Sequence, residues 1–257
     1  MSSLENIFNA IAEEGFSDSV LRLIDTHVND IQNGATDFYR FNLPEHAGLC
    51  KGGAHLIGAS IVACYAFRSF GTGGYATAGQ GTGPANWEID ERQEQLIEQW
   101  AKAAQLWVEQ SDAQLIGNFG PMIAQGAEAK VYYRDGADSV VKERASIYST
   151  TQKALDAIAL HNILFPETAM RVIGFTRDND GLFRIILTQP YVRCLRLATK
   201  TEIDDMVAAK GFTDNGDGNG VNYISPRIAL EDMHPANVFI DEVSEKPICI
   251  DCIVKFV

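Results

Sequence analysis

Asp232, Asn237 and Asp251 have the residue types and the spacing of a site that activates a hydroxyl group beside a metal ion. Asn237 follows Asp232 after four intervening residues, and Asp251 comes 14 positions after Asn237. An aspartate can accept or orient a hydroxyl proton, and paired amide and carboxylate oxygens suit Mg²⁺. The 14 positions leave room for a short hairpin that returns Asp251 beside Asn237. An Asx turn and an aspartate at a strand end would explain each residue separately.

Two basic side chains are candidates for holding phosphate in such a site. Lys142 follows two apolar β-branched residues in the run Ser139–Lys142, and a lysine there can neutralise phosphate charge. His234 stands two positions after Asp232; it can donate a hydrogen bond to a phosphate oxygen or simply order the loop. The alternative for Lys142 is a solvated side chain at a strand end.

The segment Ile123–Tyr132 places small residues where a backbone could approach phosphate closely. Ala124, Gly126 and Ala129 recur ahead of Val131, and small side chains let N–H groups reach an anion. A plain β-hairpin is the alternative. A second glycine-rich stretch, Gly71–Pro84, lacks the lysine and hydroxyl residue of a nucleotide-hydrolase loop, so we predict a linker there.

Hydrophobic periodicity predicts the elements that position these residues. The first part of the chain is predicted to be helical, with two amphipathic helices within 4–33, a buried helix over 56–67 and another amphipathic helix over 88–108. Three short strands are predicted next, over 121–124, 129–134 and 139–144. A helix over 149–163 follows them, and two more strands lie over 170–176 and 182–188. Thr199 and Glu202 form a capping box for a helix to about Ala209. Two final strands surround a turn near Glu242–Lys246.

Three strands, a helix and two strands follow one another in the N-terminal lobe of protein kinases. With the motifs above, the chain resembles the kinase domain found in bacterial and phage polyvalent proteins. The resemblance runs from about Glu91 to Ile253 and extends to His161–Thr168 and Gln189–Val192. It implies an α+β, protein-kinase-like two-lobed fold with a much reduced C-terminal lobe. Residues 88–257 would form this domain, and residues 1–87 a mainly helical extension with a glycine-rich linker.

The resemblance also implies ATP and Mg²⁺ as cofactors and assigns a role to each candidate residue. Lys142, Asp232 and His234 would be catalytic, and Asn237 and Asp251 would bind the metal. Lys142 and two segments would hold the nucleotide. The phosphate-binding loop would contribute Gly126, Ala127, Glu128, Ala129 and Val131, and the hinge that binds adenine would contribute Thr188, Gln189, Tyr191 and Val192. The γ-phosphate would pass to a hydroxyl acceptor, with a protein Ser, Thr or Tyr as the expected class.

Departures from the kinase pattern keep two alternatives open. Kinases pair the strand lysine with a helix glutamate, but Asp156 is the only carboxylate between Ser149 and Asn162. A pseudokinase that binds nucleotide or partners without transfer is the first alternative, and a small-molecule kinase is the second. Because the chain stops at Val257, regulation through a phosphorylated activation loop is not expected.

Composition narrows the classes of partner and compartment. The 257 residues include 34 acidic and 21 basic side chains, a formal net charge of -13, which opposes a broad nucleic-acid-binding surface. The most apolar stretch, Leu56–Phe67, is too short to span a bilayer, and the N-terminus lacks the pattern of a signal peptide. We therefore expect a cytoplasmic protein with no membrane partner.

The five cysteines do not form a disulfide framework, because their number is odd and their positions are scattered. Cys249 and Cys252 form a C-x-x-C pair. If both lay in one strand, their side chains would point to opposite faces. We therefore expect buried structural cysteines here rather than a metal site.

Overall fold

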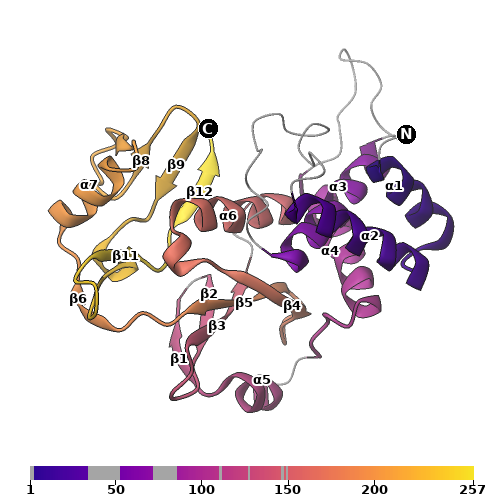
Figure 1. Cartoon of the computed structure of the whole chain (residues 1–257), viewed down its shortest axis with the longest axis horizontal. Helices are drawn as coiled ribbons and strands as arrows, with labels where there is room; N and C mark the ends of the chain where they lie inside the picture. The colour runs from indigo at the N-terminus through magenta and orange to yellow at the C-terminus, as the bar shows by residue number, and fades with distance from the viewer. Residues whose placement is uncertain are drawn as a thin grey trace.

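The N-terminal part of the chain is helical in the computed structural model (Figure 1), which describes residues 3–33, 53–71, 86–109, 112–126, 128–145, 148 and 150–257. The predicted helices are present as α1 (Ser3–Glu14), α2 (Asp18–Gln32), α3 (Ala54–Gly71) and α4 (Asn86–Ala103). The last of these is shorter than predicted, because Gln105 adopts a positive φ of 58° and Val108 donates its N–H to Phe175. The predicted linker after Gly71 lies outside the described residues.

A five-stranded antiparallel sheet follows and carries the phosphate-binding candidates. Its strands are β1 (Met122–Gln125), β2 (Ala129–Tyr132), β3 (Ser139–Ala145), β4 (Arg171–Arg177) and β5 (Phe183–Pro190), in the order β1-β2-β3-β5-β4. A short helix, α5 (Asp112–Phe119), precedes the sheet; α6 (Thr151–Leu164) and the single turn η3 (Pro166–Thr168) connect β3 to β4. The predicted succession of three strands, one helix and two strands is confirmed.

The rest of the chain forms two small antiparallel sheets. One has the order β11-β10-β6 and the other β12-β9-β8-β7. Their strands are β6 (Cys194–Leu197), β7 (Thr213–Asp214), β8 (Tyr223–Ile224), β9 (Ile228–Glu231), β10 (Val238–Asp241), β11 (Pro247–Cys249) and β12 (Ile253–Phe256). The predicted capping box of Thr199 and Glu202 starts helix α7 (Lys200–Ala208), and the predicted final hairpin is β10–β11.

The chain passes between the two small sheets three times: through α7, from β6 to β7, and then through two shorter crossings that carry candidate residues. The first of the shorter crossings runs from β9 to β10 through Asp232 and the turn η4 (Pro235–Asn237). The second runs from β11 to β12 through residues 250–252. Because neither crossing is regular strand, each can turn its polar side chains toward the space between the sheets.

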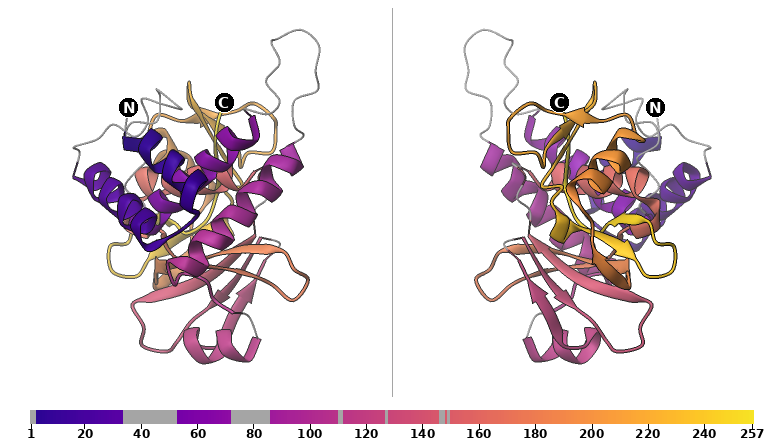
Figure 2. Two further views of the ribbon diagram at one scale, coloured as in Figure 1. Left: turned by 90° about the vertical axis from the view of Figure 1, so that its right-hand side faces the viewer. Right: turned by 90° about the vertical axis from the view of Figure 1, so that its left-hand side faces the viewer.

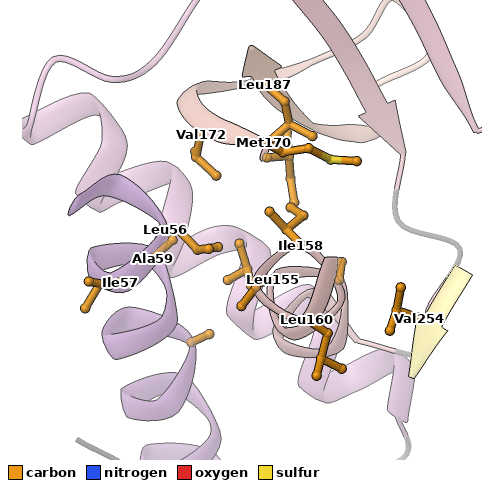
Figure 3. Close-up of a cluster of buried hydrophobic side chains, with 14 of the residues drawn as sticks. Leu56, Ile57, Ala59, Leu155, Ile158, Leu160, Met170, Val172, Leu187 and Val254 are labelled. Carbon is orange, nitrogen blue, oxygen red and sulfur yellow. The ribbon is translucent and has the colours of Figure 1, made fainter. Parts of the chain in front are cut away.

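Helix α6 lies in the middle of the molecule, between the N-terminal helices and the C-terminal strands (Figures 1 and 2). Apolar side chains of α3, α6, the five-stranded sheet and β12 meet around it, as Figure 3 shows for Leu56, Ile57, Ala59, Leu155, Ile158, Leu160, Met170, Val172, Leu187 and Val254. Burial of this apolar area is the main force that joins the parts. The mixed α+β class predicted from the sequence is confirmed.

None of the helices in the described residues combines the length and the apolar character that a membrane span requires.

Candidate active site

A cavity of about 300 Å³ lies between the β1–β2 turn and the two shorter crossings of the small sheets. The turn and the beginning of β2 contribute four of the predicted nucleotide-binding residues, and the crossings contribute Asp232, His234, Asn237 and Asp251, whereas the predicted Lys142 is not part of the lining. The lining consists of Gly126, Glu128, Ala129, Val131, Asp232, His234, Asn237, Asp251, Cys252 and Ile253. Residues separated by more than 120 positions in the sequence are thus brought to one cavity. Ala127, predicted with its neighbours, lies outside the described residues.

Asp232 enters the cavity from an unusual backbone conformation. Its φ is 63°, in the left-handed region that few residues other than glycine, asparagine and aspartate adopt. The side chain of Asn222 accepts the Asp232 N–H at 3.1 Å, and the following Met233 N–H donates to the Val221 carbonyl at 2.9 Å. These bonds fix the backbone and so set the direction of the Asp232 carboxylate.

His234 and Asn237 surround the carboxylate of Asp232. The amide nitrogen of Asn237 donates to Asp232 Oδ2 at 3.0 Å and to the Asp232 carbonyl at 2.9 Å. His234 Nδ1 accepts the Ala236 N–H at 3.2 Å, so its proton lies on Nε2, which is 3.3 Å from Asp232 Oδ1. Both neighbours orient the carboxylate. Because the side-chain nitrogen of Asn237 faces Asp232, the side-chain oxygen Oδ1 of Asn237 is the atom that can bind a cation.

The two predicted metal ligands are joined through the backbone. Ile250, next to Asp251, donates its N–H to the Asn237 carbonyl at 2.9 Å, and Val238 is directly paired with Cys249. The hairpin β10–β11 therefore holds Asn237 and Asp251 side by side on the cavity wall. An amide oxygen and a carboxylate in this arrangement fit a hard divalent cation such as Mg²⁺.

Lys142 reaches this wall from the five-stranded sheet. Its Nζ donates to the Ile250 carbonyl at 2.9 Å and lies 3.5 Å from Asp251 Oδ2. Burial lowers the pKa of the Lys142 ammonium, and Asp251 opposes that shift. Burial works against ionisation of Asp251 too, but the charges of Lys142 and Arg144 hold its pKa below the usual value. The two groups lie within ion-pair distance, and the charge of each favours the charged form of the other.

Arg144 is a cation of this site that the sequence analysis missed. Strand side chains alternate between faces, so Arg144 shares the face of Lys142, two positions earlier. Its guanidinium lies 3.8 Å from Asp251 Oδ1 and 3.3 Å from Glu128 Oε2. Two buried cations and two carboxylates thus alternate along one wall, and the alternation of β3 was the signal that could have identified Arg144.

Asp156 does not take the place of the kinase helix glutamate. It accepts a hydrogen bond from Gln152 at 3.0 Å, while Lys142 forms its ion pair with Asp251. Burial raises the pKa of Asp156 to about 6. The strand lysine is therefore held by the crossing that carries Asp251 rather than by α6.

The four predicted hinge residues lie outside the lining of the cavity. Thr188 and Gln189 belong to the end of β5, with Gln189 buried and donating to the Thr168 carbonyl at 2.9 Å. Tyr191 is exposed and stacks on Tyr133, with ring centroids 4.4 Å apart. Val192 follows beyond the strand. The structure therefore leaves their adenine-binding role a prediction.

Cys249 and Cys252 are buried, as predicted, but the expectation that their side chains diverge was wrong. Residues 250–252 are not strand, so the two thiols do not alternate between faces. Both sulfur atoms lie near His161 of α6, within a group whose ligand atoms are at most 4.8 Å apart. The hydrogen bond with Cys249 and burial together raise the pKa of the Cys252 thiol.

Asp232, Asn237 and Asp251 around one cavity, with Lys142 beside Asp251 and a small-residue turn opposite, form the kind of arrangement that kinase-like phosphotransferases use. The family described as Serine/Threonine/Tyrosine Kinase found in polyvalent proteins matches residues 90–257. The match covers more than half of the chain, and the chain belongs to this family, which confirms the resemblance inferred from the sequence. No curated protein matches the chain.

Proposed function

We propose that this protein binds ATP with Mg²⁺ in the cavity and transfers the γ-phosphate to a hydroxyl group, with a protein Ser, Thr or Tyr as the acceptor class. The observation that carries the proposal is the convergence of Asp232, Asn237 and Asp251 on the turn that contains Gly126 and Ala129. Family membership supports phosphotransfer as the class of reaction.

Each side chain has a distinct part in the proposed reaction. Lys142 and Arg144 bind phosphate oxygens, while Asn237 and Asp251 hold the cation, which supplies charge neutralisation at those oxygens. Asp232 orients the acceptor hydroxyl and takes its proton as the oxygen bonds to the γ-phosphorus. The bond from that phosphorus to the bridging oxygen of ADP breaks. Most of the rate enhancement then comes from positioning and charge.

The ion pairs around Asp251 support one feature of this proposal. Asp251 lies 3.5 Å from the Lys142 ammonium and 3.8 Å from the Arg144 guanidinium, and Glu128 is the second carboxylate beside Arg144. When phosphate and a cation bind, Lys142 and Arg144 pair with the phosphate oxygens, and Asp251 pairs with the cation. Each buried charged group then keeps a neighbour of opposite charge, which avoids the large cost of an unpaired buried ion.

Nucleotide binding is tested by thermal unfolding of the wild type and Asp251→Asn with ATP, in the presence and absence of Mg²⁺. At a ligand concentration about 100 times the dissociation constant, the wild type should gain ~2.7 kcal/mol. We expect the Mg²⁺-dependent part of this gain to disappear in Asp251→Asn. Asp205→Asn, which makes the same charge change at an exposed position of α7, should behave as wild type. No stabilisation of wild type at millimolar ATP would contradict the proposal.

Transfer itself is tested with Asp232→Asn. Loss of the group that takes the proton should lower turnover by ~10²–10⁴-fold while leaving the ATP-induced stabilisation nearly unchanged. Release of labelled phosphate or ADP measures this, with candidate protein and small-molecule acceptors supplied separately. Wild-type turnover in Asp232→Asn would remove the assignment. Nucleotide binding without transfer in the wild type would establish the pseudokinase alternative.

A further inference from the structure

Three buried side chains with metal-ligand atoms lie together behind Asp251. His161 is on α6, Cys249 ends β11 and Cys252 immediately precedes β12. Their exposed fractions are 1%, 0% and 4%, and the imidazole and thiol ligand atoms all lie within 4.8 Å of one another. This group is separate from the oxygen ligands of the cavity, although Cys252 borders both.

The hydrogen bonds of His161 fix the tautomer that a metal requires. Thr168 donates its hydroxyl proton to the Cys249 carbonyl at 2.6 Å, so its oxygen can only accept from His161 Nε2, 3.3 Å away. The Thr168 carbonyl, also 3.3 Å from Nε2, is a second acceptor. The proton therefore lies on Nε2. This leaves the lone pair of Nδ1 directed at Cys252 Sγ, as when a backbone carbonyl orients a metal-binding histidine.

The spacing of Cys252 and His161 is close to that of neighbouring ligands in a tetrahedral thiolate site. Bonds of about 2.3 Å to sulfur and 2.0–2.1 Å to nitrogen place neighbouring ligand atoms about 3.6–3.8 Å apart. The distance between Cys252 Sγ and His161 Nδ1 is 3.7 Å. Met233 adds a thioether, with its sulfur 3.9 Å from Cys249 Sγ. One nitrogen and three sulfur donors make a soft set, which favours thiophilic ions over Mg²⁺.

We propose that His161, Cys249 and Cys252 bind a single thiophilic d¹⁰ ion, Zn²⁺ or Cu⁺, with Met233 at the edge of the site. Binding displaces the two thiol protons to solvent, and the two thiolates then balance the charge of Zn²⁺ or leave one net negative charge with Cu⁺. Because the donors are buried, the ion enters as the chain folds. It ties α6 to the crossing that carries Asp251. The proposal stands independently of phosphoryl transfer.

Metal retention tests this site. Wild type, Cys249→Ser/Cys252→Ser and Cys194→Ser are purified under reducing conditions without a metal-affinity matrix and refolded with Zn²⁺ or Cu⁺ alone. After dialysis against a weak chelator, elemental analysis gives the metal content. We expect a stoichiometric ion in wild type and in Cys194→Ser, whose altered residue is exposed, and at least about a tenfold loss in the double variant. Refolding with Co²⁺ should give a thiolate-to-cobalt charge-transfer band that the double variant lacks.

The two metals are distinguished by which one is retained, and either result supports the site. Equal metal content in wild type and the double variant would overturn it, as would a Cys249–Cys252 disulfide found by thiol titration of freshly isolated protein. Should the double variant fail to fold, the wild type alone decides. Retained ion and a midpoint of unfolding that falls on treatment with a strong chelator support the site. A metal-free wild type with an unchanged midpoint rejects it.

Discussion

Asp232 adopts a left-handed backbone conformation, with φ of 63°, that its neighbours must maintain. Such residues cost on the order of 1–3 kcal/mol and persist where surrounding contacts over-determine them. Here Asn222 accepts the Asp232 N–H at 3.1 Å, and Asp217 in turn accepts from the Asn222 amide at 2.6 Å. The polar turn before β8 therefore supports the loop that carries Asp232 from outside the cavity.

This support makes Asn222 a positioning residue for the proposed reaction. Asn222→Ala removes the acceptor of the Asp232 N–H, and misplacement of the carboxylate should lower turnover by about 10²-fold. ATP-induced stabilisation should remain, because Asn222 does not line the cavity. Parallel assays of turnover and thermal shift separate the two effects. Asn118→Ala on α5 is the control, and equal turnover in both variants would show that Asn222 has no positioning role.

At the scale of elements, α6 is fastened by polar contacts from the N-terminal helices. Asp90 of α4 accepts from the hydroxyl of Thr151 at 2.6 Å, and Gln93 accepts from the Gln152 N–H at 3.0 Å. Cys64 of α3 contacts Gln152 at 3.7 Å. Asp90 also accepts the Thr151 N–H, so α4 satisfies two backbone N–H groups in the first turn of α6, and the N-cap Thr150 accepts a third, from Lys153.

Asp156 on the same helix makes stability depend on pH. Burial raises its folded-state pKa from 3.8 to about 6, so the folded state binds the proton more tightly than the unfolded state. The resulting stabilisation is complete below about pH 4 and is lost as pH rises through 6. Asp156→Asn, which has no charge to bury, should be ~3 kcal/mol more stable than wild type at pH 7–8 and no more stable below pH 4.

Denaturant unfolding of wild type and Asp156→Asn across this pH range measures the difference. Asp205→Asn on the exposed face of α7 should show no such pH-dependent gain. A constant difference between wild type and Asp156→Asn at every pH would mean that the Asp156 carboxyl does not titrate as its burial indicates.

At the scale of the whole molecule, the N-terminal helices share a core with the region that matches the kinase family. Leu56 of α3 is 2% exposed and lies with Leu155 and Ile158 of α6 (Figure 3). Gly58 faces Trp100 so closely that an added Cβ would lie 2.7 Å from its ring. Helices α3 and α4 therefore pack tightly against each other and, through α3, against the centre of the molecule.

A shared core predicts one cooperative unfolding transition. Leu56→Ala should lower the free energy of unfolding by about 2–5 kcal/mol and move the single calorimetric transition as a whole. Leu23→Ala makes the same change on α2 at a residue that is 43% exposed, and should alter stability by about 0.5 kcal/mol or less. Two calorimetric transitions, of which only the earlier responds to Leu56→Ala, would contradict a shared core.

The order of elements and most of the candidate residues could be predicted from the sequence, because both depend on local information. The strand pattern over 139–144 and the helical spacing over 149–163 indicate the secondary structure directly. The short interval between Asp232 and Asn237 places both side chains in one turn. The hairpin that returns Asp251 to Asn237 followed from the turn residues between β10 and β11. These features arise from backbone periodicity within a few residues.

The partners of those residues were decided by the tertiary structure alone. Lys142 pairs with Asp251 and not with Asp156, and Arg144 also lies beside Asp251. The predicted hinge residues lie outside the lining of the cavity. Cys249 and Cys252 converge on His161 only because the chain leaves the strand between them. Such contacts depend on how the two small sheets meet the five-stranded sheet and α6. That arrangement results from long-range burial of apolar surface, which no short segment of the sequence encodes.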